Sequence, residues 1–238
     1  MDLKGNSVTW LGHGTWLWTT SEGKRILVDP FLQNNPVCPD DLKQPGPVDG
    51  VLVTHGHIDH IADLVGFVGE SETPVFASWE VGAYLIEQGA KAVTQMGIGG
   101  TIETAGVRAT MVFAAHGSGI GDSEHTMSEG GGAAGFMLHF PDGLVAYHAG
   151  DTDVFGDMAL LAEIHSPDVA ILPIGDLFTM GPERAVHAVR LLGVKKVLCG
   201  HWGTFPPLTG TPGALRKLVP SDVEVPDLEP GSTFGASA

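Results

Sequence analysis

The sequence predicts a mixed α/β (α+β) fold in which two β-sheets pack face to face and helices cover their outer surfaces. In the N-terminal part, short segments rich in Val, Thr and Trp are separated by turn residues, which is typical of strands that pair with their neighbours. Farther along, apolar segments of strand length alternate with segments of helical pattern. Paired strands followed by alternating strands and helices favour two packed sheets with helices outside.

The expected elements follow in chain order. Strands are expected at residues 7–11, 15–19, 25–28, 51–54, 75–77, 107–115, 135–140, 144–149, 169–172 and 196–199, and helices at 80–88, 157–164 and 182–192. A further helix is expected to start near Asp59, a favourable N-cap residue. Pro182 suits the first turn of its helix, and Gly193 suits the C-terminal end.

Length and composition indicate one domain. The chain has 238 residues, 43% of them hydrophobic, which suits a single core over residues 1–226. Residues 227–238 have little apolar content and are expected to form a loosely ordered tail. No run of apolar residues is long enough for a membrane span, and the N-terminus lacks the pattern of a signal peptide, so we expect a cytoplasmic protein that does not bind membranes. Cys38 and Cys199 are expected to be free thiols.

The charge balance restricts the partners. The formal net charge is −16, with 12 Lys and Arg against 28 Asp and Glu. Because an acidic surface repels a polyanion, we expect a small-molecule substrate and no nucleic acid. Assembly into a homo-oligomer is left open by the sequence.

A cluster of candidate metal ligands directly follows the apolar run at residues 51–53. The segment His55-Gly56-His57-Ile58-Asp59-His60 places three imidazoles and one carboxylate within six consecutive residues. These are ligands that suit zinc and similar divalent ions. A strand that ends in this segment can direct two pairs of ligands at two neighbouring metal positions. The segment therefore predicts a two-metal site of the hydrolytic kind.

Three more candidates follow expected strands. His116 ends one of them, Asp151 follows a second within Gly150-Asp151-Thr152, and His201 follows a third. Strand ends that share one edge of a sheet are rigid positions from which site residues are presented.

The order of these residues resembles the ligand order of the metallo-β-lactamase superfamily. Other segments narrow the resemblance to UPF0173-type metal-dependent hydrolases related to the ascorbate-6-phosphate lactonase group. These segments are Gly12-His13-Gly14, Asp29-Pro30-Phe31, Leu172-Pro173-Ile174-Gly175, Phe178-Thr179-Met180-Gly181-Pro182 and His201-Trp202-Gly203-Thr204-Phe205-Pro206. The resemblance covers roughly residues 7–218.

The resemblance implies a metallo-β-lactamase fold, a four-layer αββα sandwich, with two metal positions. It implies that the first ion is held by His55, His57 and His116, the second by Asp59, His60 and His201, and that Asp151 bridges the two. General chemistry agrees, because three imidazoles form a typical catalytic zinc shell with room for water. One carboxylate can also hold two cations about 3.5–4 Å apart.

The resemblance also implies the activity. A metal-bridging hydroxide would cleave a small ester, lactone or phosphodiester-type substrate, and Asp59 would orient that hydroxide as well as bind metal. Two divalent ions per chain are expected, Zn²⁺ or Mn²⁺, and Fe²⁺ also suits these ligands. Diiron redox relatives carry glutamate where this chain has His57, which favours hydrolysis over redox chemistry.

Two alternative functions stay open. A nuclease or phosphodiesterase of the same fold usually adds a clamp domain or a basic arm, and the chain shows neither pattern. A non-catalytic metal-binding protein would be signalled by lost ligands, and none of the seven positions is lost.

Other residues have two interpretations each. His13, in its glycine-flanked turn, either polarises a substrate oxygen, as a catalytic residue, or is a buried turn histidine. Asp29 either orients a ligand imidazole or is a turn aspartate before proline. The loop 117–134 either forms the substrate mouth, with Glu124 or His125 contacting substrate, or is a surface excursion. His148 is expected to pack beside the site rather than bind metal.

Overall fold

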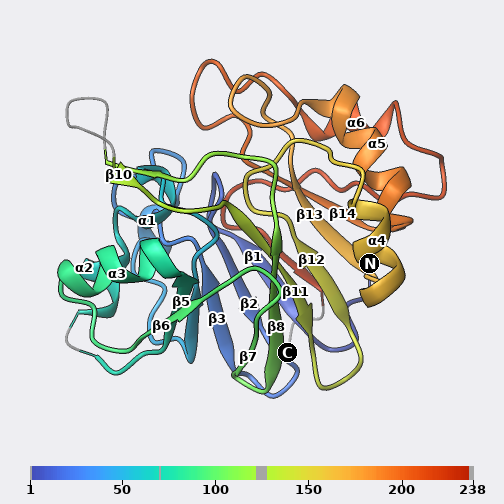
Figure 1. Ribbon diagram of the computed structural model, residues 1–238. Helices are drawn as coiled ribbons and strands as arrows, with labels where there is room; N and C mark the ends of the chain where they lie inside the picture. The colour runs from blue at the N-terminus through green and yellow to red at the C-terminus, as the bar shows by residue number, and fades with distance from the viewer. Residues whose placement is uncertain (1, 70, 122–127, 236–238) are drawn as a thin grey trace.

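The computed structural model describes residues 2–69, 71–121 and 128–235, and it contains two large sheets (Figure 1). Within these residues the first sheet has seven strands in the order β15-β1-β2-β3-β4-β5-β6. Its strands are β1 (Ser7–Trp10), β2 (Trp16–Thr19), β3 (Arg25–Val28), β4 (Gly50–Leu52), β5 (Val75–Ser78), β6 (Val93–Met96) and β15 (Thr233–Gly235). Strands β15, β1, β2 and β3 pair antiparallel, whereas β3, β4, β5 and β6 pair parallel.

The second sheet has six strands in the order β14-β13-β12-β11-β8-β7 in the described part of the chain. They are β7 (Thr101–Thr104), β8 (Val107–Phe113), β11 (Ala134–His139), β12 (Val145–His148), β13 (Val169–Pro173) and β14 (Val197–Gly200). Strands β12, β13 and β14 are parallel, and the other pairs are antiparallel. A short hairpin is formed by β9 (Gly119–Ile120) and β10 (Ser128–Glu129).

Helices cover both outer faces, on opposite flanks of the sheets in Figure 1. The first sheet is covered by α1 (Ile58–Ile61), α2 (Leu64–Val68) and α3 (Trp79–Glu87), and the second by α4 (Met158–His165), α5 (Pro182–Leu192) and α6 (Pro212–Arg216). A 3-10 turn, η1 (Asp40–Leu42), lies in the loop before β4. The expected four-layer αββα sandwich is confirmed.

Strand β4 shows why its segment is apolar without interruption. Leu52 packs in the core between the sheets, while Val51 and Val53 pack in the core beneath α1, α2 and α3. A strand covered on both faces needs apolar residues at every position. The chain therefore leaves β4 from a fixed position, and His55 follows three residues after its last residue, Leu52.

Tryptophans fill the core between the sheets. Trp10 stacks on Trp16 with ring centroids 5.9 Å apart, and on Trp202 at 5.4 Å. Trp16 and Trp18 are both buried there, as expected from their shared face of one strand. This packing holds the ends of β1, β2 and β14 together, where His13 and His201 lie.

The structure differs from two expectations. The expected loose tail is anchored over residues 227–235, because Leu228 is buried between the sheets and β15 forms a backbone ladder with β1. A backbone ladder needs no apolar side chains, so composition alone did not indicate it. Residues 236–238 lie outside the described residues. The helix expected near Asp59 begins at Ile58 with His57 as N-cap, and Asp59 lies in its first turn.

Two remaining expectations can be compared with the structure. Cys38 and Cys199 are free and buried, and burial raises the pKa of the Cys38 thiol to about 11. Among the helices described, none has the length and apolar character needed to cross a lipid bilayer.

Candidate metal centre

The candidate site lies along one edge of the sandwich, where strands from both sheets end. His13 occupies the turn between β1 and β2, and the segment from His55 to His60 follows β4. His116, Asp151 and His201 come after β8, β12 and β14. The two sheets are joined here, because the His201 backbone N–H donates to the His13 carbonyl at 2.9 Å. All eight expected site residues therefore come together.

The first group of ligand candidates contains His55, His57 and His116. His55 Nε2 lies 2.9 Å from His57 Nδ1, and His116 Nε2 lies 3.3 Å from the same atom. Burial lowers the pKa of all three imidazoles, so each is neutral near pH 7 and offers a lone pair. His57 and His116 are partly exposed, whereas His55 is buried, so this group opens toward solvent.

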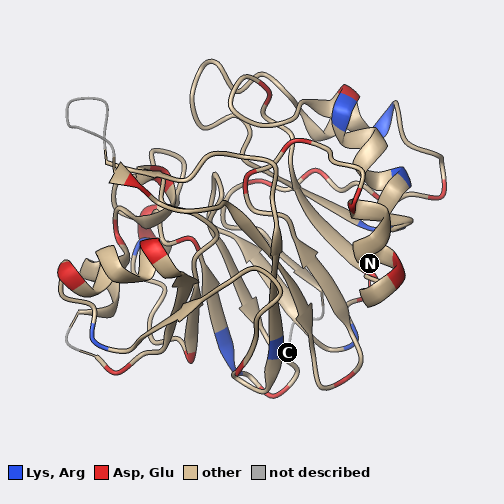
Figure 2. Cartoon of the chain, in the orientation of Figure 1, with Lys and Arg blue, Asp and Glu red and all other residues tan. Residues whose placement is uncertain are grey.

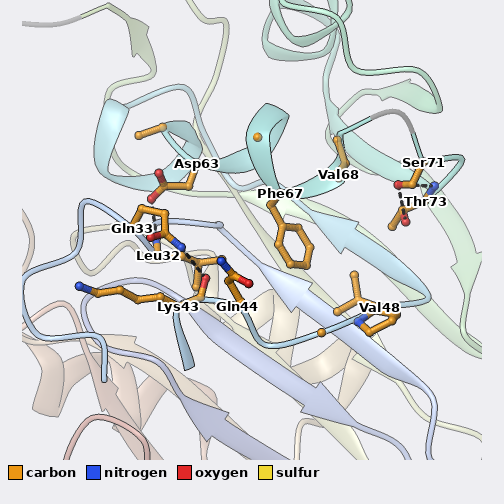
Figure 3. Close-up of a pocket in the computed structure, with 14 residues that line it drawn as sticks. Leu32, Gln33, Lys43, Gln44, Val48, Asp63, Phe67, Val68, Ser71 and Thr73 are labelled. Carbon is orange, nitrogen blue, oxygen red and sulfur yellow. Dashed lines mark hydrogen bonds between the residues drawn. The ribbon is translucent and has the colours of Figure 1, made fainter. Parts of the chain in front are cut away.

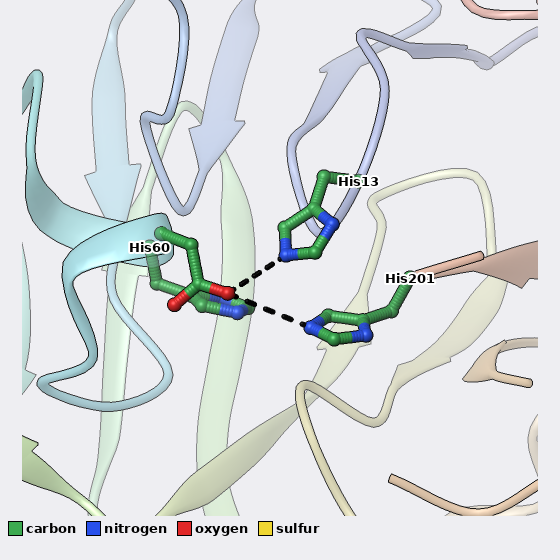
Figure 4. Close-up of side chains that lie close together, drawn as sticks. His13, His60 and His201 are labelled. Atoms are coloured by element: carbon green, nitrogen blue, oxygen red, sulfur yellow. Dashed lines mark hydrogen bonds and ion pairs between the residues drawn. The ribbon is translucent and has the colours of Figure 1, made fainter. Parts of the chain in front are cut away.

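The second group contains Asp59, His60 and His201, with His13 beside them. One ligand atom from each of the four lies within 4.8 Å of the others. Figure 4 shows the rings of His13, His60 and His201 directed toward one another from three separate elements. His13 Nε2 lies 2.8 Å and His201 Nε2 3.8 Å from Asp59 Oδ2.

Asp151 connects the two groups through one carboxylate oxygen. Its Oδ2 lies 3.0 Å from His201 Nε2 and 3.5 Å from His60 Nε2 in the second group. The same atom lies 3.7 Å from His116 Nε2 and 4.0 Å from His55 Nε2 in the first group. Although burial opposes ionisation, His201 and His60 hold the pKa of Asp151 well below its ordinary value. The carboxylate is therefore charged and central.

Two buried imidazole nitrogens point into this centre and, apart from their ion-pair contacts with the nearby carboxylates, have no hydrogen-bond partner. They are Nε2 of His60 and Nε2 of His201. Buried polar atoms are normally paired, so both positions fit an additional electrophile such as a metal ion. Burial lowers the pKa of each ring, but Asp151 and the neighbouring carboxylates outweigh it. The pKa of His201 rises to about 9, and that of His60 rises as well.

Asp29 supports the centre from beneath. It accepts hydrogen bonds from the Thr54 backbone N–H at 2.8 Å, from Thr54 Oγ1 at 2.6 Å and from His60 Nδ1 at 2.8 Å. Because the Thr54 hydroxyl donates to Asp29, it accepts from His55 Nδ1 at 2.9 Å. His55 and His60 therefore carry their protons on Nδ1 and present Nε2 to the centre. These contacts favour the orienting role of Asp29 over that of a turn aspartate.

His13 is fully buried and uses both ring nitrogens. Its Nε2 donates to Asp59, and its Nδ1 accepts from Thr204 Oγ1 at 2.9 Å. Burial and the nearby His201 lower the pKa of His13 to about 4, so the ring is neutral. A neutral imidazole with one donor and one acceptor in use has no lone pair left for a metal. This arrangement favours orientation of Asp59 over the expected contact with a substrate oxygen.

Sharp turns aim several of these side chains inward. His13, Asp29 and His201 adopt left-handed backbone conformations, with φ of 54°, 50° and 52°. Each such residue costs roughly 1–2 kcal/mol relative to the right-handed region. Such strained backbone conformations persist only where surrounding contacts stabilise them, and they are more frequent at functional sites.

Two glycines in the quoted motifs are required by close approach. A Cβ on Gly14 would lie 2.5 Å from His60 Cε1. A Cβ on Gly150, whose φ is 62°, would lie 2.6 Å from the Ala134 carbonyl oxygen. The motifs Gly12-His13-Gly14 and Gly150-Asp151-Thr152 therefore combine site residues with the space those residues need.

The loop 117–134 is anchored beside the first group. Ser118 Oγ accepts from the Gly56 N–H at 3.1 Å and donates to the Gly130 carbonyl at 2.9 Å. His57 and Gly121 form an isolated bridge, which places the β9–β10 hairpin next to the ligands. The expected substrate contacts of Glu124 and His125 lie outside the described residues. Sequence reasoning did not single out Ser118, Thr54 or Thr204, although Thr204 lies in a quoted motif.

A larger cavity lies elsewhere, between α2 and the loop before β4 (Figure 3). Its volume is about 680 Å³, and Phe67, Val48 and Leu32 form much of its apolar wall. None of the imidazoles lines it, and the Asp63 carboxylate in its wall already accepts from the Leu32 N–H at 2.6 Å. The cavity therefore lacks the reactive groups of the metal centre.

Several known proteins are similar to this chain in sequence and in fold. Residues 24–202 match the family model described as a beta-lactamase superfamily domain. A UPF0173 metal-dependent hydrolase of Rubrobacter xylanophilus is 43% identical over 237 residues, 98% of each chain. Another, from Koribacter versatilis, is 43% identical over 234 residues, 98% of this chain and 100% of that protein. Among solved structures, the metallo hydrolase Igni18 of Ignicoccus hospitalis superposes with a TM-score of 0.84 at 30% identity, covering 98% of this chain and 99% of its own.

Proposed function

The chain belongs to the UPF0173 metal-dependent hydrolases of the beta-lactamase superfamily, and from this premise we propose that it is a dinuclear hydrolase of small substrates. The scissile group is an ester, a lactone or a phosphodiester. The proposal depends mainly on one observation. Asp151 Oδ2 lies within 4.0 Å of imidazole nitrogens from both ligand groups, as a bridging carboxylate requires.

The donor set divides in a way that fits two ions. His55, His57 and His116 supply three neutral imidazoles for one position. Asp59, His60 and His201 supply a carboxylate and two imidazoles for the other. Two bound divalent ions, Zn²⁺ or Mn²⁺, would lower the pKa of a water molecule and stabilise negative charge on a substrate oxygen.

We infer that Asp59 orients the attacking water. Its side chain is 28% exposed, whereas that of Asp151, the other carboxylate between the ligand groups, is 4% exposed. Its Oδ2 is held by the His13 N–H, and His13 is held in turn by Thr204. Although burial opposes ionisation, the hydrogen bond from His13 and the nearby His201 and His60 keep the pKa of Asp59 below its ordinary value. Asp59 is therefore a charged acceptor for a proton of that water, and His13 is its positioning residue.

The surface favours a small molecule over nucleic acid. Figure 2 shows Asp and Glu on loops and helices around the molecule and only scattered Lys and Arg. The total of 12 Lys and Arg against 28 Asp and Glu would repel a polyanion from most directions.

A substrate screen tests this proposal. Protein reconstituted with Zn²⁺ or Mn²⁺ is assayed against chromogenic esters, lactones and a phosphodiester, beside Asp59→Asn and the control Asp157→Asn. Asp157 is exposed and lies outside the centre, so its variant should keep full activity. We expect Asp59→Asn to lose at least about 100-fold in kcat, within the range seen when a general base is removed. Hydrolysis of no class above the Asp59→Asn background would contradict the proposal.

A further inference from the structure

A small cavity lies on the core side of the second ligand group. Its wall includes His60, Asp151, His201 and His148, and its volume is about 10 Å³. A space of this size accommodates about one water molecule when polar atoms line it. Three of the four named residues are ligand candidates, so the cavity adjoins the metal centre directly.

His148 is the fourth polar residue of this wall. It ends β12 and is 2% exposed, and its Nδ1 is buried without a hydrogen-bond partner. The preceding residue, Tyr147, packs in the outer core beneath the helices, so His148 points to the opposite face, toward the space between the sheets. A buried imidazole nitrogen without a protein partner, in a residue that lines a cavity of one water, is satisfied if a polar molecule occupies that cavity.

Direct binding of the ion by His148 does not fit the geometry. Asp151 Oδ2 lies 3.5 Å from His60 Nε2 and 3.0 Å from His201 Nε2, whereas among the described residues no hydrogen bond or ion pair joins the His148 ring to these three residues. A link through one intervening water fits both this lack of a direct bond and the size of the cavity.

We propose that His148 is a positioning residue of the second metal position, acting on its ligands through a single water in the cavity shared with His60, Asp151 and His201. This inference rests on the proposed dinuclear function and adds a residue to it. Groups that orient metal ligands from outside typically contribute about 10–100-fold in metal affinity.

The test compares two substitutions of His148 with a matched control. His148→Phe keeps the approximate size of the ring and removes its nitrogens, whereas His148→Gln restores a hydrogen-bonding group. Tyr147→Phe, the control, removes the other buried and unpartnered polar atom of the same strand on its opposite face. Zn²⁺ affinities of both equivalents are measured by competition with a chelator, and the absorption spectrum is recorded after loading with Co²⁺. Circular dichroism of each metal-free variant checks the fold.

In wild-type protein we expect two bound equivalents. His148→Phe should weaken one of them by about 10-fold or more and alter the Co²⁺ spectrum, while His148→Gln restores most of the affinity. Tyr147→Phe should match wild type. The inference is overturned if folded His148→Phe binds both ions as wild type does, or if His148→Gln is as weak as His148→Phe. Fewer than two ions in wild type would instead contradict the proposed function.

Discussion

Asp29 Oδ2 lies 2.8 Å from His60 Nδ1, and the same oxygen accepts the Thr54 hydroxyl, whose own oxygen faces His55 Nδ1. One buried carboxylate therefore orients an imidazole in each ligand group, directly in one and through a hydroxyl in the other. The two metal positions share a support beneath them as well as the Asp151 carboxylate between them. This relationship predicts that both positions respond to one substitution.

Asp29→Asn should weaken both bound ions. An amide presents one accepting atom and one donating group, so it cannot accept from Thr54 N, Thr54 Oγ1 and His60 Nδ1 together. We expect a loss of about 10–100-fold in affinity at each position, measured by chelator competition. Asp63→Asn is the control, because Asp63 also accepts from loop N–H groups but, within the described part of the chain, hydrogen-bonds to no imidazole. An Asp29→Asn protein with wild-type affinity at both positions would refute the shared support.

Asp151→Ala should remove the link between the positions. Without Oδ2 both groups lose a ligand. Two cations bound in the buried centre would then repel each other without the negative charge of the Asp151 carboxylate between them. We expect much less than one tightly bound ion per chain by elemental analysis after desalting. Asp153→Asn, two residues away, weakens the exposed pair with Arg184, retains a side-chain oxygen for the Val154 N–H and should keep the metals. Retention of two ions and full activity by Asp151→Ala would show that the bridging assignment is wrong.

Gly14→Ala tests the space beside His60. The new methyl group would lie 2.5 Å from His60 Cε1, so the imidazole must move away from Asp29 and Asp151. The affinity of one ion should fall by about 10-fold or more, the scale of a displaced orienting contact. Gly213→Ala in α6 meets nothing within 4 Å and serves as the control. Equal metal affinity of the two variants would contradict the close approach.

Metal binding should release protons near pH 7. Burial opposes protonation of His60 and His201, yet the neighbouring carboxylates raise the pKa of both, to about 9 for His201. Both rings are therefore positively charged at pH 7 and must each lose one proton to bind metal, so the affinity of their position should rise as the pH is raised from 7 to 9. His55, His57 and His116 have lowered pKa values, so their position should bind without this pH dependence above neutrality.

Calorimetry in buffers of different ionisation enthalpy counts these protons. The expected count at pH 7 is about two for one equivalent, one each from His60 and His201, and close to zero for the other. Identical proton counts for both equivalents would mean that the two groups do not differ in charge as described.

Much of the site was predictable because its ligands are local or follow strands. The segment from His55 to His60 is contiguous, and His116, Asp151 and His201 follow apolar runs, so sequence order indicates where each lies. The helix at Pro182–Leu192 was also predictable from its terminal Pro and Gly. In each case a pattern of residues close together in the sequence is sufficient to predict the position of the ligand or the helix.

Other features depend on contacts between distant residues, which no local pattern shows. β15 pairs with β1 across more than two hundred residues, through backbone bonds that leave no mark in composition. Likewise, His13 and Thr204 meet only because β14 ends beside the β1–β2 turn. The role of His13 therefore required the structure, since its partners determine whether a lone pair remains for metal.

The metal content of protein purified without added metal or chelator tests the central claim most directly. Elemental analysis of that protein, and of metal-free protein reloaded with Zn²⁺ or Mn²⁺, should give about two divalent ions per chain, as a carboxylate-bridged pair requires. One ion or none, unchanged by reloading, would contradict a dinuclear centre built on Asp151.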